Sequence, residues 1–133
     1  MAQPSGPLVG RKVLLVEDNY LIAEHVRGLL EDAGCDVVGP ASGLARALAL
    51  VHSGAAMDGA LLDINLDGEF CFAAAAALSE RGIPFVFVTG YDDRTIVPRE
   101  FAEWPVLSKP LDERRLIETV AATFPVPARD EDT

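Results

Sequence analysis

The sequence has few cysteines and no long apolar run, and each shortage excludes a class of protein. Its 133 residues include two cysteines, Cys35 and Cys71, which form neither a disulfide framework nor a zinc-binding spacing. We expect both to be small buried apolar side chains. No run approaches the roughly 20 apolar residues of a membrane span, and residues 1–7 lack the features of a secretory signal. We therefore expect a cytoplasmic protein with no membrane partner.

Positive charge is also scarce. The chain has 11 Lys and Arg residues against 21 Asp and Glu residues, a formal net charge of −10. Because nucleic-acid phosphates need a basic surface, no nucleic-acid partner is expected. The glycine-rich fingerprints of dinucleotide and P-loop sites are missing, so a nucleotide site is unsupported. We expect one domain, residues 11–124, between a flexible N-terminal segment, 1–10, and a flexible acidic tail, 125–133.

Short apolar runs alternate with segments that have apolar residues at helical spacing. This pattern predicts an α/β fold: a doubly wound, flavodoxin-like, five-stranded parallel sheet of strand order 2-1-3-4-5 with helices on both faces. We expect strands at residues 12–17, 36–39 (closed by Pro40), 59–63, 83–89 and 105–107. We expect helices at 19–33, 44–52, 69–81 and 111–124, with a short or irregular helix in 92–104.

Polar side chains stand where four of the predicted strands end. Glu17 ends the first strand and Asp18 follows it, Asp63 ends the third, Thr89 ends the fourth, and Lys109 follows the fifth. The carboxyl ends of parallel strands share one edge of the sheet, and ligands bind at that edge. Three carboxylates, a hydroxyl and an ammonium would therefore meet in a pocket that can hold a divalent cation and accept a phosphoryl group.

The acidic pair has a simpler interpretation, in which Asp18 or Asn19 caps the following helix. Capping needs one short polar side chain and does not explain the adjacent Glu17 at a buried sheet edge. Like charges crowd there at a cost unless a cation neutralises them. Mg²⁺ fits this need because it binds through few carboxylates and keeps several waters.

Two alternatives for Asp63 follow from its neighbours. Residues 63–68 match the opening of a calcium-binding EF-hand loop, but the required twelfth-position glutamate is Ala74, so this is rejected. The approach to Asp63 also resembles haloacid dehalogenase-type phosphatases, whose nucleophilic aspartate is followed two residues later by an acid. That position is Asn65, which cannot donate a proton as an acid. A phosphoryl ester on Asp63 would then be stored rather than turned over.

Thr89 and Lys109 are ordinary residues in isolation. Thr89 could serve only as a β-branched strand residue, yet its hydroxyl can donate to a phosphoryl oxygen. Lys109 stands before Pro110, and a cis bond between them could aim the ammonium into the pocket.

Taken together, these residues make the chain similar to the receiver domains of two-component response regulators, over residues 12–124. The resemblance implies Mg²⁺ bound by Glu17, Asp18, Asp63 and the backbone carbonyl of Asn65, with Asp63 as phosphoacceptor. It implies that Thr89 and Lys109 contact the phosphoryl group. It further implies a histidine kinase or histidine phosphotransfer protein as phosphodonor, a possible downstream protein target, and no turnover enzyme.

The chain departs from the usual receiver pattern at two places. Receivers commonly carry an aromatic three residues before the lysine, and here that residue is Val106; Tyr91 and Trp104 are alternative switching aromatics. The turn after Asp63 lacks the common Met-Pro. Residues 87–91, Phe-Val-Thr-Gly-Tyr, resemble a Phe-Ala-Thr-Gly sub-branch found as stand-alone receivers or fused to sensor kinases. A receiver-like interaction module that works without phosphate is a third functional class.

Surface roles are less specific. Leu21, Ile22 and Val26 on the first helix could pack in the core or dock a phosphodonor, and core packing is the simpler assignment. His25 and His52 are expected to be solvated or capping. The output surface is expected at the fourth helix, the fifth strand and the last helix.

Overall fold

The computed structural model describes residues 6–90 and 96–126, and these form a layered α/β domain. Five parallel strands make the sheet in the order β2-β1-β3-β6-β7. Numbered within this sheet alone, that order is 2-1-3-4-5, which confirms the prediction. The strands are β1 (Lys12–Val16), β2 (Asp36–Ala41), β3 (Gly59–Asp63), β6 (Phe85–Thr89) and β7 (Val106–Ser108); the helices are α1 (Tyr20–Asp32), α2 (Leu44–His52), α3 (Phe72–Glu80) and α4 (Glu113–Thr123).

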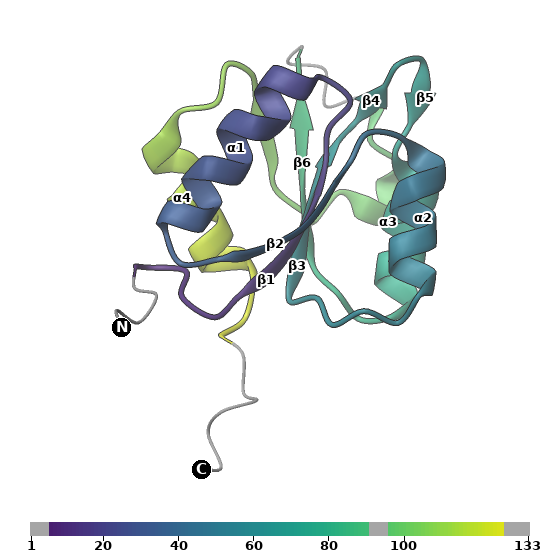
Figure 1. The fold of residues 1–133 in the computed structure, drawn as a ribbon. Helices are drawn as coiled ribbons and strands as arrows, with labels where there is room; N and C mark the ends of the chain where they lie inside the picture. Colours follow the sequence, from purple (N-terminus) through teal and green to yellow (C-terminus); the bar gives the residue numbers. More distant parts are fainter. Residues whose placement is uncertain (1–5, 91–95, 127–133) are drawn as a thin grey trace.

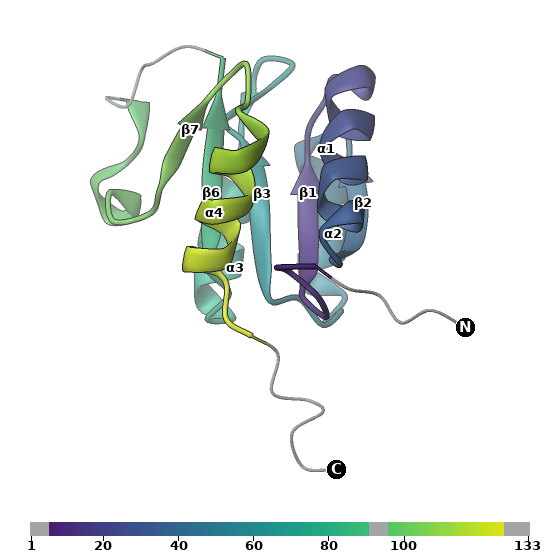
Figure 2. The same ribbon diagram turned by 90° about the vertical axis from the view of Figure 1, so that its left-hand side faces the viewer.

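Helices cover both faces of the sheet, α1 and α4 on one side and α2 and α3 on the other (Figures 1 and 2). Because successive side chains of a strand point to opposite faces, β1 contributes Leu14 to the α2–α3 side and Val13 to the α1–α4 side. Both residues are fully buried. The central strands therefore need apolar side chains at every position, which explains their continuous aliphatic runs.

Strand β2 continues beyond the predicted end at residue 39. It runs through Pro40 to Ala41, although we expected Pro40 to close it. β2 is an edge strand, where a missing N–H is tolerated on the solvent side. The Gly39–Pro40 bond is cis, Gly39 has a φ of 97°, and the register with β1 shifts so that Ala41 pairs with Val16.

A short hairpin separates β3 from α3, where we expected a helix from residue 69. Strands β4 (Asn65–Leu66) and β5 (Glu69–Phe70) pair antiparallel, and α3 begins at Phe72. The two turn residues, Asp67 and Gly68, have φ of 53° and 94°. Asp-Gly is a favoured pair for such two-residue turns because both positions need positive φ. The helix prediction was therefore wrong at residues 69–71.

The connection from β6 to β7 contains a 3-10 helix, η2 (Arg99–Phe101), in its described part. This agrees with the expected short or irregular helix, while residues 92–95 lie outside the described ranges. Within residues 96–105 the expected output surface therefore has a 3-10 turn instead of an α-helix.

Part of the N-terminal segment packs against the domain, although we expected residues 1–10 to be flexible. Leu8 is fully buried in the α1–α4 core, and its N–H donates to the Ala33 carbonyl at 2.9 Å. Packing therefore begins before residue 11, because Leu8 supplies apolar area that the core can bury. Within residues 6–90 and 96–126, no helix combines the length and the apolar character needed to cross a membrane.

Candidate functional site

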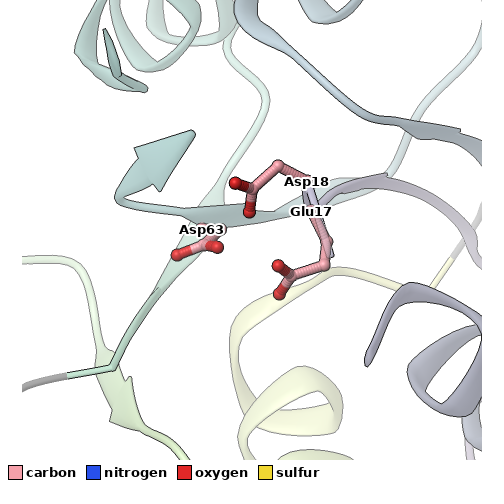
Figure 3. Close-up of side chains that lie close together, drawn as sticks. All are labelled: Glu17, Asp18 and Asp63. Carbon is pink, nitrogen blue, oxygen red and sulfur yellow. The ribbon is translucent and has the colours of Figure 1, made fainter. Parts of the chain in front are cut away.

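Three carboxylates meet at the carboxyl edge of the sheet, as the strand pattern predicted. Glu17 and Asp18 directly follow β1, and Asp63 ends the neighbouring strand β3. One carboxylate oxygen from each lies within 4.8 Å of the other two, and Figure 3 shows the side chains converging. Glu17 and Asp63 are both 4% exposed, whereas Asp18 is more open. A cation at this point could bind all three.

Helix capping is assigned to Asn19, which leaves Asp18 available. The Asn19 side chain accepts a hydrogen bond from the Ile22 N–H at the start of α1. The Asn19 N–H in turn donates to Glu17 Oε2 at 3.1 Å. The chain therefore holds the Glu17 carboxylate in place from its own backbone.

Lys109 supplies positive charge to the same edge. Its Nζ lies 3.0 Å from Glu17 Oε1 and 3.0 Å from Asp63 Oδ2. The Lys109–Pro110 bond is cis, as the sequence allowed. The backbone N–H of Lys109 donates to the Thr89 carbonyl at 2.8 Å, so the loop after β7 is hydrogen-bonded to the end of β6. The ammonium thus bridges two acids from neighbouring strands.

The acids outnumber the cation at this edge, and the pKa values of Asp63 and Lys109 are both raised. Burial raises the pKa of Asp63 to about 7, nearby Glu17 adds to the rise, and the Lys109 ammonium opposes it. Burial alone would lower the pKa of Lys109, but its hydrogen bonds and ion pairs with Glu17 and Asp63 outweigh this and raise it. A site with three carboxylates and one ammonium has room for further positive charge. A divalent cation with oxygen ligands fits this donor set.

Thr89 lies at the same edge, at the end of β6, and is 5% exposed. β6 pairs with β3 so that Asp63 is opposite Val88, which places Thr89 one residue further along. Asn65 follows on β4, where its side-chain Oδ1 accepts from the Gly68 N–H at 2.9 Å. The topology therefore brings every predicted site residue to one edge.

Comparison with known families agrees with this geometry. The sequence model of the response regulator receiver domain matches residues 13–121. The chain belongs to this family. Receivers of this family accept phosphoryl groups and are not turnover enzymes in the ordinary sense.

Individual relatives support the assignment. The receiver is 32% identical over 112 residues to the transcriptional regulatory protein BtsR of Escherichia coli K12, covering 83% of this chain and 46% of that protein. It thus spans about half the length of the curated relatives that it matches. The solution structure of SdrG from Sphingomonas melonis Fr1 is 41% identical, with a TM-score of 0.73 over 84% of this chain and 94% of SdrG. A receiver from Sinorhizobium medicae WSM419 is 26% identical, with a TM-score of 0.74 over 84% and 92% of the two chains.

The sequence did not reveal how the backbone after Asp63 is held. The Ile64 N–H donates to the Val88 carbonyl at 2.8 Å, and the Ile64 carbonyl accepts from the Cys71 N–H at 2.9 Å. Cys71 is the buried N-cap residue of α3 and does not lie within the helix as expected. The Asp67-Gly68 pair was a readable signal for the hairpin that makes this arrangement.

Of the two alternative switching aromatics, Trp104 lies within the described residues and Tyr91 does not. The Trp104 ring packs on Phe85 with centroids 4.9 Å apart. Phe85 begins β6 and Thr89 ends it, so Trp104 lies towards the opposite end of the strand. Tyr91 lies outside the described residues. Val106, at the usual aromatic position, is partly buried.

An apolar groove adjoins the site between α1 and the loop after β7. It encloses about 550 Å³, and its lining includes Leu21, Ile22, Val26 and Leu111. Val26 is buried and packs in the core, whereas Leu21 is 76% exposed. Val26 therefore has the core role, whereas Leu21 is exposed on the surface of α1. His25 also lines the groove and lies 3.8 Å from Glu113, with both side chains largely exposed.

Proposed function

We propose that Asp63 is the phosphoacceptor and that its phosphorylation alters binding to a partner protein. The observation that carries this proposal is the convergence of Glu17, Asp18, Asp63 and Lys109 at one sheet edge. The phosphodonor is a phosphohistidine on a histidine kinase or a histidine phosphotransfer protein, and a cytoplasmic location follows from that donor. Residues 11–124 are the proposed receiver unit.

The cation in this proposal is Mg²⁺. Its ligands are carboxylate oxygens of Glu17, Asp18 and Asp63 and the backbone carbonyl of Asn65. When bound, Mg²⁺ neutralises charge on the phosphoryl oxygens, as it does in phosphoryl transfer generally. The raised pKa of Asp63, to about 7, supports this choice because crowded, buried carboxylates favour added positive charge.

The protein's own groups perform the transfer. An Asp63 carboxylate oxygen attacks the phosphorus in line and forms a P–O bond, while the P–N bond to the donor imidazole breaks and its electron pair returns to nitrogen. Lys109, now 3.0 Å from Asp63 Oδ2, can pair with a phosphoryl oxygen of the product. The Thr89 hydroxyl donates to another. Both groups thus bind oxygens that unmodified Asp63 lacks, which shifts a conformational equilibrium.

A solved relative supports a phosphorylation response. SdrG from Pseudomonas melonis Fr1 has a solution structure titled as its BeF3-activated conformation, 37% identical to this chain over 92% of it, with a TM-score of 0.70. Beryllofluoride mimics an aspartyl phosphate, so we propose that Asp63 also binds it.

The phosphatase alternative is less well supported. A dehalogenase-type mechanism needs an acid at position 65, and Asn65 uses its side-chain oxygen to accept the Gly68 N–H in the hairpin turn. An amide in that role provides no proton for leaving-group departure. The expected product is therefore a stored acyl phosphate that hydrolyses slowly.

Labelling by a small phosphodonor tests the proposal. Wild-type protein incubated with radiolabelled acetyl phosphate and Mg²⁺ should gain label, whereas Asp63→Asn and wild type with excess EDTA should gain none. Asp58→Asn is the matched control, because Asp58 accepts from the Lys12 N–H at the opposite end of the sheet. It should label as wild type does.

Three results would contradict the proposal. Persistent labelling of Asp63→Asn would assign the phosphoryl group to another residue. Undiminished labelling in EDTA would return Glu17 and Asp18 to a purely structural role. If a partner binds wild type and Asp63→Asn equally with and without acetyl phosphate, the chain is instead a phosphate-independent interaction module.

A further inference from the structure

Most aromatic rings of the chain form one continuous cluster beside the sheet. The chain has six phenylalanines and one tryptophan. Five of the phenylalanines and the tryptophan are in contact, with centroids of neighbouring rings between 4.9 and 6.3 Å apart. We call these residues the aromatic cluster: Phe70, Phe72, Phe85, Phe87, Phe101 and Trp104.

One end of the aromatic cluster is attached to the backbone that follows Asp63. Phe70 and Phe72 flank Cys71, whose N–H donates to the carbonyl of Ile64, the residue after Asp63. The rings of Phe70 and Phe72 lie 5.6 Å apart, and Phe70 is 50% exposed on the hairpin. Phe72 is therefore linked to the loop after Asp63 through the residue that precedes it.

The other end is attached to η2. Phe101 is 4% exposed, and its ring lies 6.3 Å from Phe72 and 5.6 Å from Phe85. The backbone N–H of Trp104 donates to the Phe101 carbonyl at 3.1 Å, so Trp104 is linked directly to η2. Phe101 is thus wedged between α3 and β6, and its position depends on both.

These contacts have the strength that a switch requires. An aromatic pair contributes about 0.5–1.5 kcal/mol beyond its buried area, and coupling between sites is typically about 1–3 kcal/mol. A close-packed cluster also tends to rearrange between discrete states instead of deforming gradually. Two rearranged ring contacts would therefore suffice to couple the site to η2.

We propose that the aromatic cluster couples the state of Asp63 to the position of η2, through contact of Phe72 with Phe101. This inference rests on the proposed function and adds a route of transmission. Receivers commonly carry a switching aromatic at the position of Val106, which has no ring. In this chain α3 and η2 take over the switching role.

Trp104 provides the readout, because it is the only tryptophan in the chain. Beryllofluoride and Mg²⁺ are added to the 133-residue chain, and Trp104 emission is followed. Bound beryllofluoride is measured separately by ¹⁹F NMR. In wild type, the bound fluorine signal and a shift in Trp104 emission should rise together over the same concentration range.

Phe72→Leu should reduce the emission change at least about twofold while the bound fluorine signal persists. Phe101→Leu is the second variant, with the same expectation. The matched control is Phe124→Leu, because Phe124 is 2% exposed in the α1–α4 core on the other face of the sheet. It loses a buried ring without touching the aromatic cluster and should keep the full emission change.

A further test needs only the wild-type protein. Amide exchange at Phe101 and Ala102, whose N–H groups donate to the Pro98 and Arg99 carbonyls, should change on beryllofluoride binding. A bound fluorine signal without changes in Trp104 emission and these amides would overturn the inference alone. Equal emission changes in Phe72→Leu, Phe101→Leu and Phe124→Leu would do the same. Absence of any bound signal would overturn the proposed function, and the inference with it.

Discussion

The two ends of the parallel sheet both bury charged side chains, but they balance the charge differently. At the carboxyl end, Glu17 and Asp63 are buried beside one cation, Lys109. At the amino end, Arg11 is 7% exposed and donates to two uncharged acceptors, the carbonyls of Phe124 at 3.2 Å and Pro7 at 2.9 Å.

Both ends satisfy their hydrogen bonds. Within residues 6–90 and 96–126, no fully buried side-chain nitrogen or oxygen lacks a partner. The difference lies in charge: acids crowd together at one end, while backbone dipoles surround a single guanidinium at the other. Burial and Glu17 accordingly raise the pKa of Asp63 to about 7. This contrast supports the proposal that the carboxyl end binds a cation and a phosphoryl group, whereas the amino end contributes to stability.

The largest expected effect is at the amino end. Arg11→Met keeps an apolar stem of similar shape but removes the guanidinium. The Pro7 and Phe124 carbonyls are then left without their donor. The free energy of unfolding should fall by roughly 2–4 kcal/mol, measured by urea denaturation. Lys12→Met is the control, since its ion pair with Asp36 is long, at 3.9 Å, and largely exposed, and it should change stability by less than about 1 kcal/mol. A stability of Arg11→Met equal to that of wild type would remove the distinction between the ends.

At the carboxyl end, by contrast, we expect a substitution that raises the free energy of unfolding. In the metal-free protein, Asp63→Asn should raise the free energy of unfolding by roughly 1–3 kcal/mol at pH 8, because it removes a buried carboxylate beside Glu17. The pKa of Asp63 rises from 3.8 to about 7 on folding. Between these values the folded chain retains a proton that the unfolded chain has lost, so wild-type stability falls as pH rises through this window.

The advantage of Asp63→Asn should therefore be greatest above pH 7 and shrink towards pH 4. Thermal or urea unfolding of both proteins across this range provides the measurement. Gly28→Ala in α1, which changes no titratable group, should differ from wild type by a constant amount across the same range. A constant difference between Asp63→Asn and wild type would show that burial at this edge costs no charge-dependent free energy.

Cation binding should distinguish the ends more modestly. Glu17→Gln keeps an oxygen that can accept the Asn19 N–H but removes a charge, so Mg²⁺ affinity should fall about tenfold. Isothermal titration calorimetry measures it, with Asp58→Asn expected to bind Mg²⁺ as wild type does. Equal weakening in both variants would point to long-range charge instead of a local site.

The smallest effect concerns the hairpin that borders the site. Gly68 has a φ of 94°, and a Cβ built there meets nothing within 4 Å, so only the backbone conformation resists substitution. Gly68→Ala should cost about 1 kcal/mol of unfolding free energy. Gly28→Ala, in α1 with equally open space, should instead stabilise by about 0.5–1 kcal/mol. Urea unfolding of both variants compares them, and a stabilising Gly68→Ala would contradict the turn geometry.

Much of the site could be predicted because periodicity and strand ends are local properties. Asp63 follows an apolar run, and parallel order brings the ends of neighbouring strands together, so the convergence of Glu17, Asp18 and Asp63 was foreseeable. Residues 69–71 lie outside the helix because the Asp67-Gly68 turn favours a hairpin there, and this overrides the helix preference of the alanine-rich residues that follow. The packing of Leu8 was missed because a single apolar residue carries no periodic pattern.

The sequence by itself determined the sheet order, the edge at which the polar strand-end residues gather and which residues stand there, since each follows from side-chain type and spacing along the chain. Only the tertiary structure decided that Lys109 bridges Glu17 and Asp63, that Asn19 takes the capping role, and that five phenylalanines and Trp104 join into one cluster. Those outcomes depend on distances between residues remote in sequence. Packing of the whole domain sets such distances, and no local pattern encodes them.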